Sequence, residues 1–159
     1  MELVEAEAKD TRKLKELWFS LAREVEEYSE LNEIKADKPD EVSGEGFREH
    51  IESEEYTELL VKEEGELVGF VTIRQDDHPS RKLSEYTEIV NLLIGEEYRS
   101  QGLGSSVIEK IKEIARERNS DYLKVSSEWK NNGARKFYRE NGFKQKQVTY
   151  TQKLEGKQQ

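Results

Sequence analysis

The stretch Thr87-Glu88-Ile89-Val90-Asn91-Leu92-Leu93-Ile94, followed shortly by Arg99-Ser100-Gln101-Gly102-Leu103-Gly104-Ser105, decides the fold of this chain. Its first part is rich in β-branched and large apolar residues, a composition typical of a buried strand. After the glycines, apolar residues recur at helical spacing, at Leu103, Val107, Ile108, Ile111, Ile114 and Ala115. The sequence therefore predicts a buried strand that passes through a glycine-containing loop into an amphipathic helix.

The loop between the predicted strand and helix is suited to bind a phosphate. The first turn of a helix leaves backbone N–H groups unpaired and carries the positive end of the helix dipole. An anion is stabilised by both, and Gly102 and Gly104 let it approach the backbone closely. Arg99 adds a positive charge at the same place.

Known phosphate-binding loops differ in their glycine spacing, which separates the possible interpretations. A Rossmann fingerprint would need a small residue where Val107 stands, and a P-loop would need a Gly-Lys-Ser/Thr ending that is absent here. The spacing resembles R-x-x-G-x-G, the pyrophosphate loop of the GNAT superfamily of N-acetyltransferases. A tight strand-to-helix turn that binds no ligand is the remaining alternative.

A second segment, residues 131–143, resembles the other GNAT signature, N-x-x-A-x-x-x-Y-x-x-x-G-F. It reads as a short helix that Asn131 can cap and that Gly142 can end in the left-handed region. Ala134 and Tyr138 share a face of this helix because they are four residues apart. The two signatures stand in the family's order, and the resemblance extends over nearly the whole chain.

The resemblance implies an α/β (α+β) architecture, the GNAT fold. Its central sheet is mixed, mostly antiparallel and twisted, with about six or seven strands, splayed central strands and about four flanking helices. We expect a single domain over residues 1–154 and a frayed tail over residues 155–159. From the local patterns we expect strands at 1–6, 56–61, 67–73, 87–94, 122–125 and 143–154, helices at 8–25, 47–53, 103–115 and 131–141, and a mobile connection at 75–82.

Composition limits the classes of function. The 159 residues contain no cysteine, which excludes disulfides, thiolate catalysis and cysteine-based metal sites. The net charge of -9 argues against nucleic-acid binding, because phosphate contacts need a basic face. No apolar run is long enough to cross a bilayer, so we expect a cytoplasmic protein without a membrane partner. Whether it forms a homodimer is left open.

Two groups of polar residues have a functional and a purely solvated interpretation. His50 and His78 stand in polar surroundings, so we interpret them as solvated and expect no metal site. An acidic cluster lies in the region that lines the acceptor groove of GNAT proteins, and either attracts a protonated amine or forms a solvated helix face. Its members are Glu45, Glu49, Glu52, Glu54 and Glu55.

The resemblance also implies the acyl donor, acetyl-CoA, with no metal. In the family its pantetheine arm lies where the donor strand splays from the next, here residues 92–94 against 122–125, and free N–H groups there stabilise an oxyanion. Asn131 either contacts this arm or caps its helix. The cofactor-binding residues so implied are Leu92, Leu93, Ile94, Arg99, Ser100, Gln101, Gly102, Leu103, Gly104, Ser105, Asn131 and Ala134.

Two residues are implied to be catalytic. Glu88 resembles the carboxylate base of several GNAT members, and without a bulge it would share a strand face with apolar Val90 and Leu92. A surface ion pair is the alternative for Glu88, and Glu85 is the reserve candidate. Tyr138 matches the tyrosine that often protonates the leaving thiolate, with a buried structural aromatic as its alternative.

The function so implied is an N-acetyltransferase. It moves acetyl from acetyl-CoA to a primary amine by direct attack within a ternary complex. The acceptor is either a cationic small molecule such as a polyamine, or a protein lysine or N-terminal amine. A sensor or scaffold domain that binds acetyl-CoA without turnover is the alternative.

Overall fold

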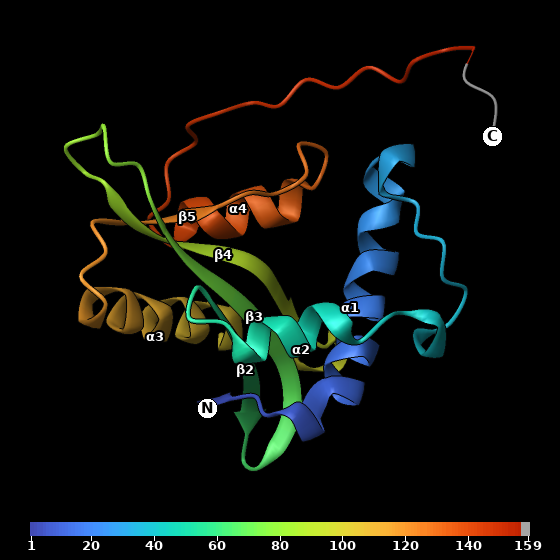
Figure 1. Cartoon of the computed structure of the whole chain (residues 1–159), viewed down its shortest axis with the longest axis horizontal. Coiled ribbons are helices and arrows are strands. Elements are labelled where there is room, and N and C mark those ends of the chain that lie inside the picture. The colour runs from blue at the N-terminus through green and yellow to red at the C-terminus, as the bar shows by residue number, and fades with distance from the viewer. Residues whose placement is uncertain (157–159) are drawn as a thin grey trace. The chain divides into compact units, whose positions relative to one another are not determined.

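The computed structural model describes residues 1–156, and the chain divides into two compact units, Met1–Ser126 and Ser127–Gln159. The first unit holds a five-stranded sheet with helices on its faces (Figure 1). Its strands are β1 (Glu2–Glu5), β2 (Tyr56–Glu63), β3 (Glu66–Asp77), β4 (Glu85–Ile94) and β5 (Tyr122–Val125). Its α-helices are α1 (Thr11–Val25), α2 (Glu45–Glu52) and α3 (Leu103–Glu117). Short 3-10 turns lie at Ala8–Asp10, Glu26–Tyr28, Glu30–Asn32, Pro39–Glu41 and Glu96–Tyr98.

The sheet has the strand order β1-β2-β3-β4-β5. The first three neighbouring pairs are antiparallel, and β4 pairs with β5 in parallel. The parallel pair needs a crossover, which α3 supplies. The expected mixed and mostly antiparallel GNAT-type sheet with about four helices is thus confirmed.

The helices cover opposite faces of this sheet. Leu14 of α1 and Phe47 of α2 join a buried core with Leu60, Phe70 and Leu93 from β2, β3 and β4. The C-terminal end of α3 lies on the other face, where Arg118 donates a hydrogen bond to Thr57 of β2. Strand residues therefore divide by alternation into an α1/α2 face and an α3 face.

A β-bulge in β4 changes which residues share a face. Thr72 of β3 pairs with Asn91, whereas the next residue of β3, Ile73, pairs with Ile89, so Val90 has no partner opposite it. The expected alignment of Glu88 with Val90 and Leu92 is therefore wrong. Glu88 and Asn91, on either side of the bulge, both lie on the α1/α2 face.

β3 is longer than its apolar pattern predicts. It continues through Arg74 and Asp76 to Asp77, where His78 donates a backbone hydrogen bond to Ser84 at the base of the loop. The connection between β3 and β4 is therefore residues 78–84 and not the expected residues 75–82. Polar side chains extend the strand because Arg74 and Asp76 find partners across the sheet.

The second unit contains α4 (Asn132–Glu140). Asn131 caps its start, since Asn131 Oδ1 accepts a hydrogen bond from the Ala134 N–H at 3.0 Å. Gly142, with a φ of 88°, ends the helix in a Schellman arrangement in which the Phe143 N–H reaches the Tyr138 carbonyl at 3.0 Å. The Phe143 ring then packs edge-on against Tyr138, 5.6 Å between ring centroids.

The expected last strand, residues 143–154, is not formed within the part of the chain that the structure describes, so the sheet there has five strands. This segment is mostly polar, and its apolar residues Val148, Tyr150 and Leu154 are exposed. An extended segment without a buried face gains little from ordering. Of the expected tail, residues 157–159 lie outside the described residues, and a single domain over residues 1–154 stays a prediction.

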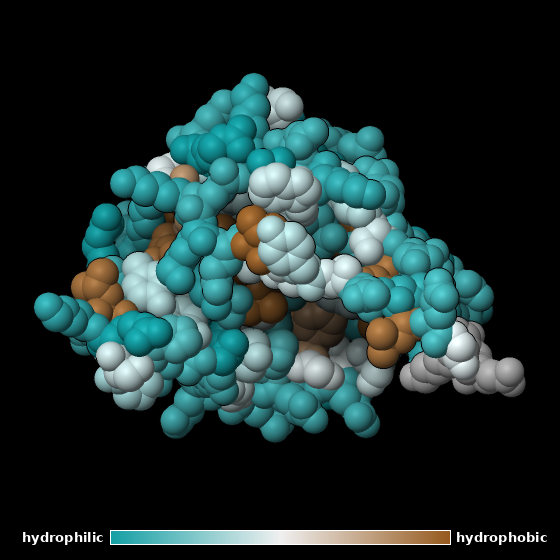
Figure 2. Space-filling view, turned by 90° about the horizontal axis from the view of Figure 1, so that it is seen from above, coloured by the Kyte–Doolittle hydropathy of each residue, from teal (hydrophilic) through white to brown (hydrophobic). Residues whose placement is uncertain are grey.

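One face of the molecule is mostly hydrophilic. In the face seen in Figure 2, hydrophobic side chains appear only in small, separate groups among hydrophilic ones. This agrees with the 38% of residues that are charged. None of the described helices is long and apolar enough to span a bilayer.

We expect Gly69→Ala to lower the free energy of unfolding by roughly 1–3 kcal/mol. A Cβ at Gly69 of β3 would overlap the Leu93 carbonyl oxygen of β4, so the two strands would have to separate. Gly46→Ala on α2 is the matched control. Its Cβ would meet no atom within 4 Å, and it should raise stability by about 0.5–1 kcal/mol. Urea unfolding measures both, and equal effects would contradict the close β3–β4 contact.

Candidate functional site

β4 runs past the end of β5 and leaves backbone donors that have no strand partner among residues 1–156. The parallel register pairs Ile89 with Val125, the last residue of β5, while β4 continues to Ile94. The Gly95 N–H bonds to β3 at Val68, so by alternation the N–H groups of Leu93 and Asn91 also face β3. Those of Leu92 and Ile94 face the other way, where β5 has ended. An extended ligand can pair with them there.

The expected phosphate loop leads directly into α3. Gly102 has a φ of 80° and stands at the N-cap, and none of the described side chains caps the helix. Ser100 also has a positive φ of 64°. The first intrahelical bond of this turn runs from the Ser106 N–H to the Gly102 carbonyl, so the N–H groups of residues 103–105 have no helical partner. An anion can bind at this turn.

Arg99 is held in place rather than free. Its Nε donates to the Ile94 carbonyl at 2.7 Å, at the edge of β4 that β5 leaves open. Its Nη2 forms an ion pair with Glu24 of α1 at 2.8 Å. Because Glu24 offsets much of this charge, phosphate binding at the loop would rely mainly on backbone N–H groups.

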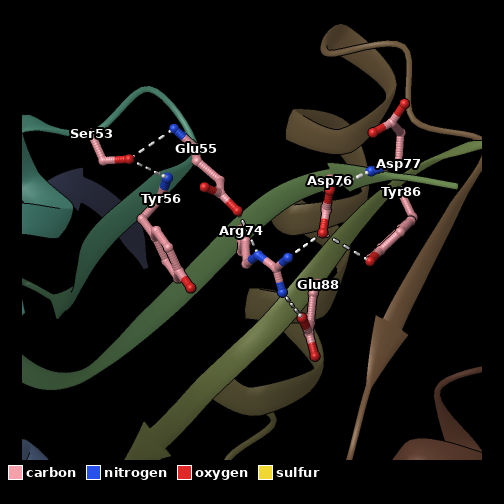
Figure 3. Close-up of polar contacts among 8 residues, drawn as sticks. All are labelled: Ser53, Glu55, Tyr56, Arg74, Asp76, Asp77, Tyr86 and Glu88. Carbon is pink, nitrogen blue, oxygen red and sulfur yellow. Dashed lines mark hydrogen bonds and ion pairs between the residues drawn. The ribbon is translucent and has the colours of Figure 1, made fainter. Parts of the chain in front are cut away.

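Glu88 lies in a polar cluster around Arg74, shown in Figure 3. Arg74 Nη1 is 3.3 Å from Glu88 Oε1, Arg74 Nε donates to Glu55 at 2.8 Å, and Arg74 Nη2 also pairs with Asp76. The hydrogen bond from Arg74 to Glu55 is the largest cause that raises the arginine pKa, so Arg74 stays charged. The expectation of apolar surroundings for Glu88 is therefore wrong. Its carboxylate is oriented by a cation and is 19% exposed.

Aromatic rings continue this cluster along the sheet. The Tyr86 hydroxyl donates to Asp76 at 3.2 Å, and its ring stacks between those of His78 and Tyr122. Burial raises the pKa of Tyr86, and the pKa of Asp76 is lowered, first by the Asp77 backbone N–H and further by Arg74. His78 itself is exposed, as expected.

His50 is placed differently from the expectation. Its Nδ1 lies 2.7 Å from Oε2 of Glu58, a carboxylate whose side chain is fully buried. The imidazole also stacks on Tyr56, with 3.9 Å between ring centroids. The interpretation of His50 as a solvated side chain is thus wrong. The sequence did contain a signal for this contact. Glu58 is a charged residue close to the apolar residues of β2, and a buried carboxylate needs a hydrogen-bonding partner.

The acidic cluster is mostly a solvated surface. All five of its carboxylate residues are exposed in the described structure. Only Glu55 joins the polar cluster, through Arg74. Glu85, the reserve base, lies at the start of β4, where its backbone N–H bonds to the Asp121 carboxylate at 3.0 Å.

The expected site residues fall into the two compact units. The first unit brings Glu88, the free edge of β4 and the phosphate loop into one sheet-and-helix arrangement. The second unit holds Asn131, Ala134 and Tyr138 on α4. Burial raises the pKa of Tyr138 to about 12, so its phenol stays protonated and can donate a hydrogen bond at neutral pH.

The described residues contain no group of three or more His, Cys, Asp or Glu side chains that could hold a metal ion.

The chemistry that this geometry supports is the binding of a phosphate-bearing, extended donor beside a carboxylate. Residues 12–143 match the family model described as the acetyltransferase (GNAT) family. The chain belongs to this family.

Solved structures share this fold over almost all of the chain. The tetramutant of the BH1408 protein from Bacillus halodurans has a TM-score of 0.84 at 20% identity, covering 97% of this chain and 100% of that one. The ribosomal-protein-alanine N-acetyltransferase from Brucella melitensis biovar Abortus 2308 has a TM-score of 0.72 at 16% identity, covering 96% and 98%. The aminoglycoside acetyltransferase meta-AAC0020 from an uncultured soil metagenomic sample has a TM-score of 0.71 at 16% identity, covering 97% of this chain and 96% of that one.

The raised pKa of Tyr138 has a consequence for stability at high pH. A phenol whose pKa rises from 10 to about 12 on folding stabilises the protein below pH 10, and this contribution is lost as the pH rises towards 12. Relative to that of Tyr138→Phe, the free energy of unfolding of the wild type should fall by on the order of 2 kcal/mol between pH 10 and pH 12. Urea unfolding from pH 8 to 12 measures the difference. Tyr150→Phe, whose ring is 91% exposed, is the control, and equal pH slopes for both variants would contradict the assignment.

Proposed function

We propose that this GNAT protein transfers acetyl from acetyl-CoA to a primary amine by direct attack within a ternary complex. Two features carry the proposal: the N–H groups of Leu92 and Ile94, which no described strand satisfies, and the start of α3, which no described side chain caps. These are the two sets of donors that an acyl-CoA needs. One pairs with the amides of its pantetheine arm, and the other receives its pyrophosphate.

The same free edge serves the chemistry. When an amine attacks the thioester carbonyl, negative charge develops on its oxygen. A backbone N–H on β4 that has no strand partner can donate to this oxygen without rearrangement. The loss of such a donor typically costs about 10²–10³-fold in rate.

Proton transfers assign roles to Glu88 and Tyr138. An alkylamine with a pKa of about 10.4 is almost fully protonated at neutral pH and must lose a proton before it can attack. Glu88, oriented by Arg74, takes this proton directly or through water. The C–N bond then forms, the C–S bond breaks, and the Tyr138 hydroxyl gives its proton to the leaving thiolate. The attacking nitrogen loses a second proton as the amide forms, and this proton returns through water to the Tyr138 oxygen. Asn131 and Ala134 hold the start of the helix that carries Tyr138.

The charges around Glu88 favour a cationic acceptor. Glu55, Asp76 and Glu88 share one cation, Arg74, so the cluster retains negative charge. Two structurally similar proteins are named for amine acceptors, a ribosomal protein alanine and an aminoglycoside. A cationic small molecule such as a polyamine and a protein lysine or N-terminal amine therefore both fit.

One observation favours the non-catalytic alternative. The Glu88–Arg74 ion pair already satisfies the carboxylate that the reaction needs. A sensor or scaffold would bind acetyl-CoA at the same donors without turnover. A thiol-release assay with acetyl-CoA and polyamines, aminoglycosides, amino acids and peptides decides between the two functions. Release that depends on an amine supports the enzyme, and binding without release supports the sensor.

We expect Gly102→Val to abolish acetyl-CoA binding. Valine is disfavoured at a φ of 80°, and its side chain would stand between the ligand and the backbone N–H groups. Calorimetry measures the dissociation constant, and a thermal scan checks that the variant is folded. Gly65→Val, at a φ of 83° in the β2–β3 turn, carries the same backbone strain away from the loop and should bind as wild type does. Unchanged binding by folded Gly102→Val would remove the phosphate-loop assignment.

We expect Glu88→Gln to bind acetyl-CoA normally but to lose turnover near neutral pH. Because higher pH supplies neutral amine from solution, the variant should recover part of its deficit towards about pH 9–10. Glu85→Gln is the matched control on the same strand and should behave as wild type does. A deficit of equal size at every pH would show that Glu88 binds the acceptor or supports the fold, and the recovering profile in Glu85→Gln instead would assign the base there.

A further inference from the structure

A chain of hydrogen bonds crosses the α1/α2 face from α2 to the bulged strand. His50 Nδ1 lies 2.7 Å from Glu58 Oε2, Thr72 Oγ1 donates to Glu58 Oε1 at 2.5 Å, and Asn91 Nδ2 donates to Thr72 Oγ1 at 3.1 Å. We call these four residues, His50, Glu58, Thr72 and Asn91, the relay. Glu58 and Thr72 are buried, whereas His50 and Asn91 at the two ends are partly exposed.

The direction of this chain is fixed at its centre. Glu58 Oε1 is an acceptor, so the single hydrogen of the Thr72 hydroxyl points to it. Thr72 Oγ1 must then accept its other bond, and the donor is the Asn91 amide. Burial raises the pKa of Glu58, but a proton on Oε2 would face His50 and leave the bond between Oε1 and Thr72 unchanged.

The Asn91 amide oxygen is left facing outward. With Nδ2 turned to Thr72, Oδ1 has no hydrogen-bond partner among residues 1–156. Every buried side-chain nitrogen or oxygen in those residues does have a partner, so this oxygen is accessible to solvent or a ligand. The buried Glu58 carboxylate, two hydrogen bonds away, thus keeps the Asn91 oxygen available as an acceptor at the surface.

The position of that oxygen relates it to the proposed chemistry. Asn91 comes directly after the bulged Val90, and its neighbour Leu92 carries one of the N–H groups of β4 that lie beyond the end of β5. On the same face and across the bulge lies Glu88. The Asn91 oxygen and the Glu88 carboxylate are therefore two acceptors on one face of β4, beside the donors proposed for the thioester.

We propose that Asn91 binds the acceptor amine through Oδ1, with Thr72, Glu58 and His50 as positioning residues that keep this oxygen turned to the substrate. The inference rests on the proposed acetyl transfer. A primary amine that attacks through its lone pair keeps two N–H bonds. Glu88 accepts a hydrogen bond from one of them and Asn91 accepts a hydrogen bond from the other, which directs the lone pair at the thioester carbon.

This arrangement selects primary amines. An N-methylated acceptor has one N–H bond once it is neutral, so it leaves either Glu88 or Asn91 without a partner. An unpaired polar group in a desolvated site weakens binding of that substrate. The wild type should therefore prefer a primary amine over its N-methyl analogue, and this preference should depend on Asn91.

The test compares Asn91→Leu, Thr72→Val and the double variant. With the best amine from the thiol-release panel, Asn91→Leu should lower kcat/KM for the amine by about 10-fold or more, as for one lost hydrogen bond. The dissociation constant for acetyl-CoA should not change. Thr72→Val frees the amide to rotate and should reproduce part of the loss, but should add nothing to Asn91→Leu. Thr57→Val, a buried hydroxyl on the α3 face, is the matched control.

The far end of the relay is tested by a pair of variants at His50. In His50→Gln the side-chain N–H₂ can still donate to Glu58, whereas in His50→Leu no group can. We expect near wild-type kcat/KM from His50→Gln and a loss from His50→Leu. Recovery of kcat/KM in His50→Gln but not in His50→Leu would show that His50 acts through its hydrogen bond rather than through its packing. This comparison can be made even if Asn91→Leu does not fold.

Each outcome decides a distinct point. If no amine releases CoA with the wild type, the proposed function fails irrespective of Asn91. If the wild type is active and folded Asn91→Leu keeps its kcat/KM and its preference for primary amines, the inference is overturned while the function stands. Additive losses in the double variant, or equal losses in both His50 variants, would also overturn the positioning role.

Discussion

The site depends on one constraint, which is that β4 extends beyond the end of β5, its parallel neighbour. Backbone N–H groups inside a protein require partners, and β5 stops opposite Ile89. Beyond this point, Leu92 and Ile94 present donors that no strand of the described sheet satisfies, while Leu93 is anchored to β3 and the core. The bulge at Val90 also shapes this edge, because it determines which side chains lie next to these N–H groups. The fold thereby provides an edge that an acyl-CoA can complete.

Around this edge the protein arranges polar groups that a simple apolar core would not tolerate. Glu58 is fully buried, yet hydrogen bonds from Thr72 and the neighbouring His50 satisfy it. Arg74 holds three carboxylates on the same face. These networks fix the orientation of Glu88 and Asn91. Positioning by rigid strands, rather than by mobile loops, is what an attacking amine requires.

Much of this architecture could be predicted from the residues, because local patterns specify it. Alternation and helical spacing place β1–β5 and α1–α4, glycine conformation identifies the loop at Gly102, and Asn131 caps its helix as its residue type suggests. The bulge, by contrast, is set by pairing between strands and has no local signal. The partners of His50 and Glu88 depend on contacts between distant segments. Residues 143–154, which form no strand in the described part of the chain, show that an alternating pattern alone does not ensure strand pairing.

The central claim is that acetyl-CoA pairs with the free edge of β4, and amide hydrogen exchange read residue by residue by NMR tests it most directly. Without ligand, the N–H groups of Leu92 and Ile94 should exchange fast, whereas that of Leu93, bonded to β3, should be protected. Acetyl-CoA should protect Leu92, Ile94 and the first turn of α3, and leave Leu93 unchanged. Fast exchange at Leu92 and Ile94 in the presence of saturating acetyl-CoA would contradict the account.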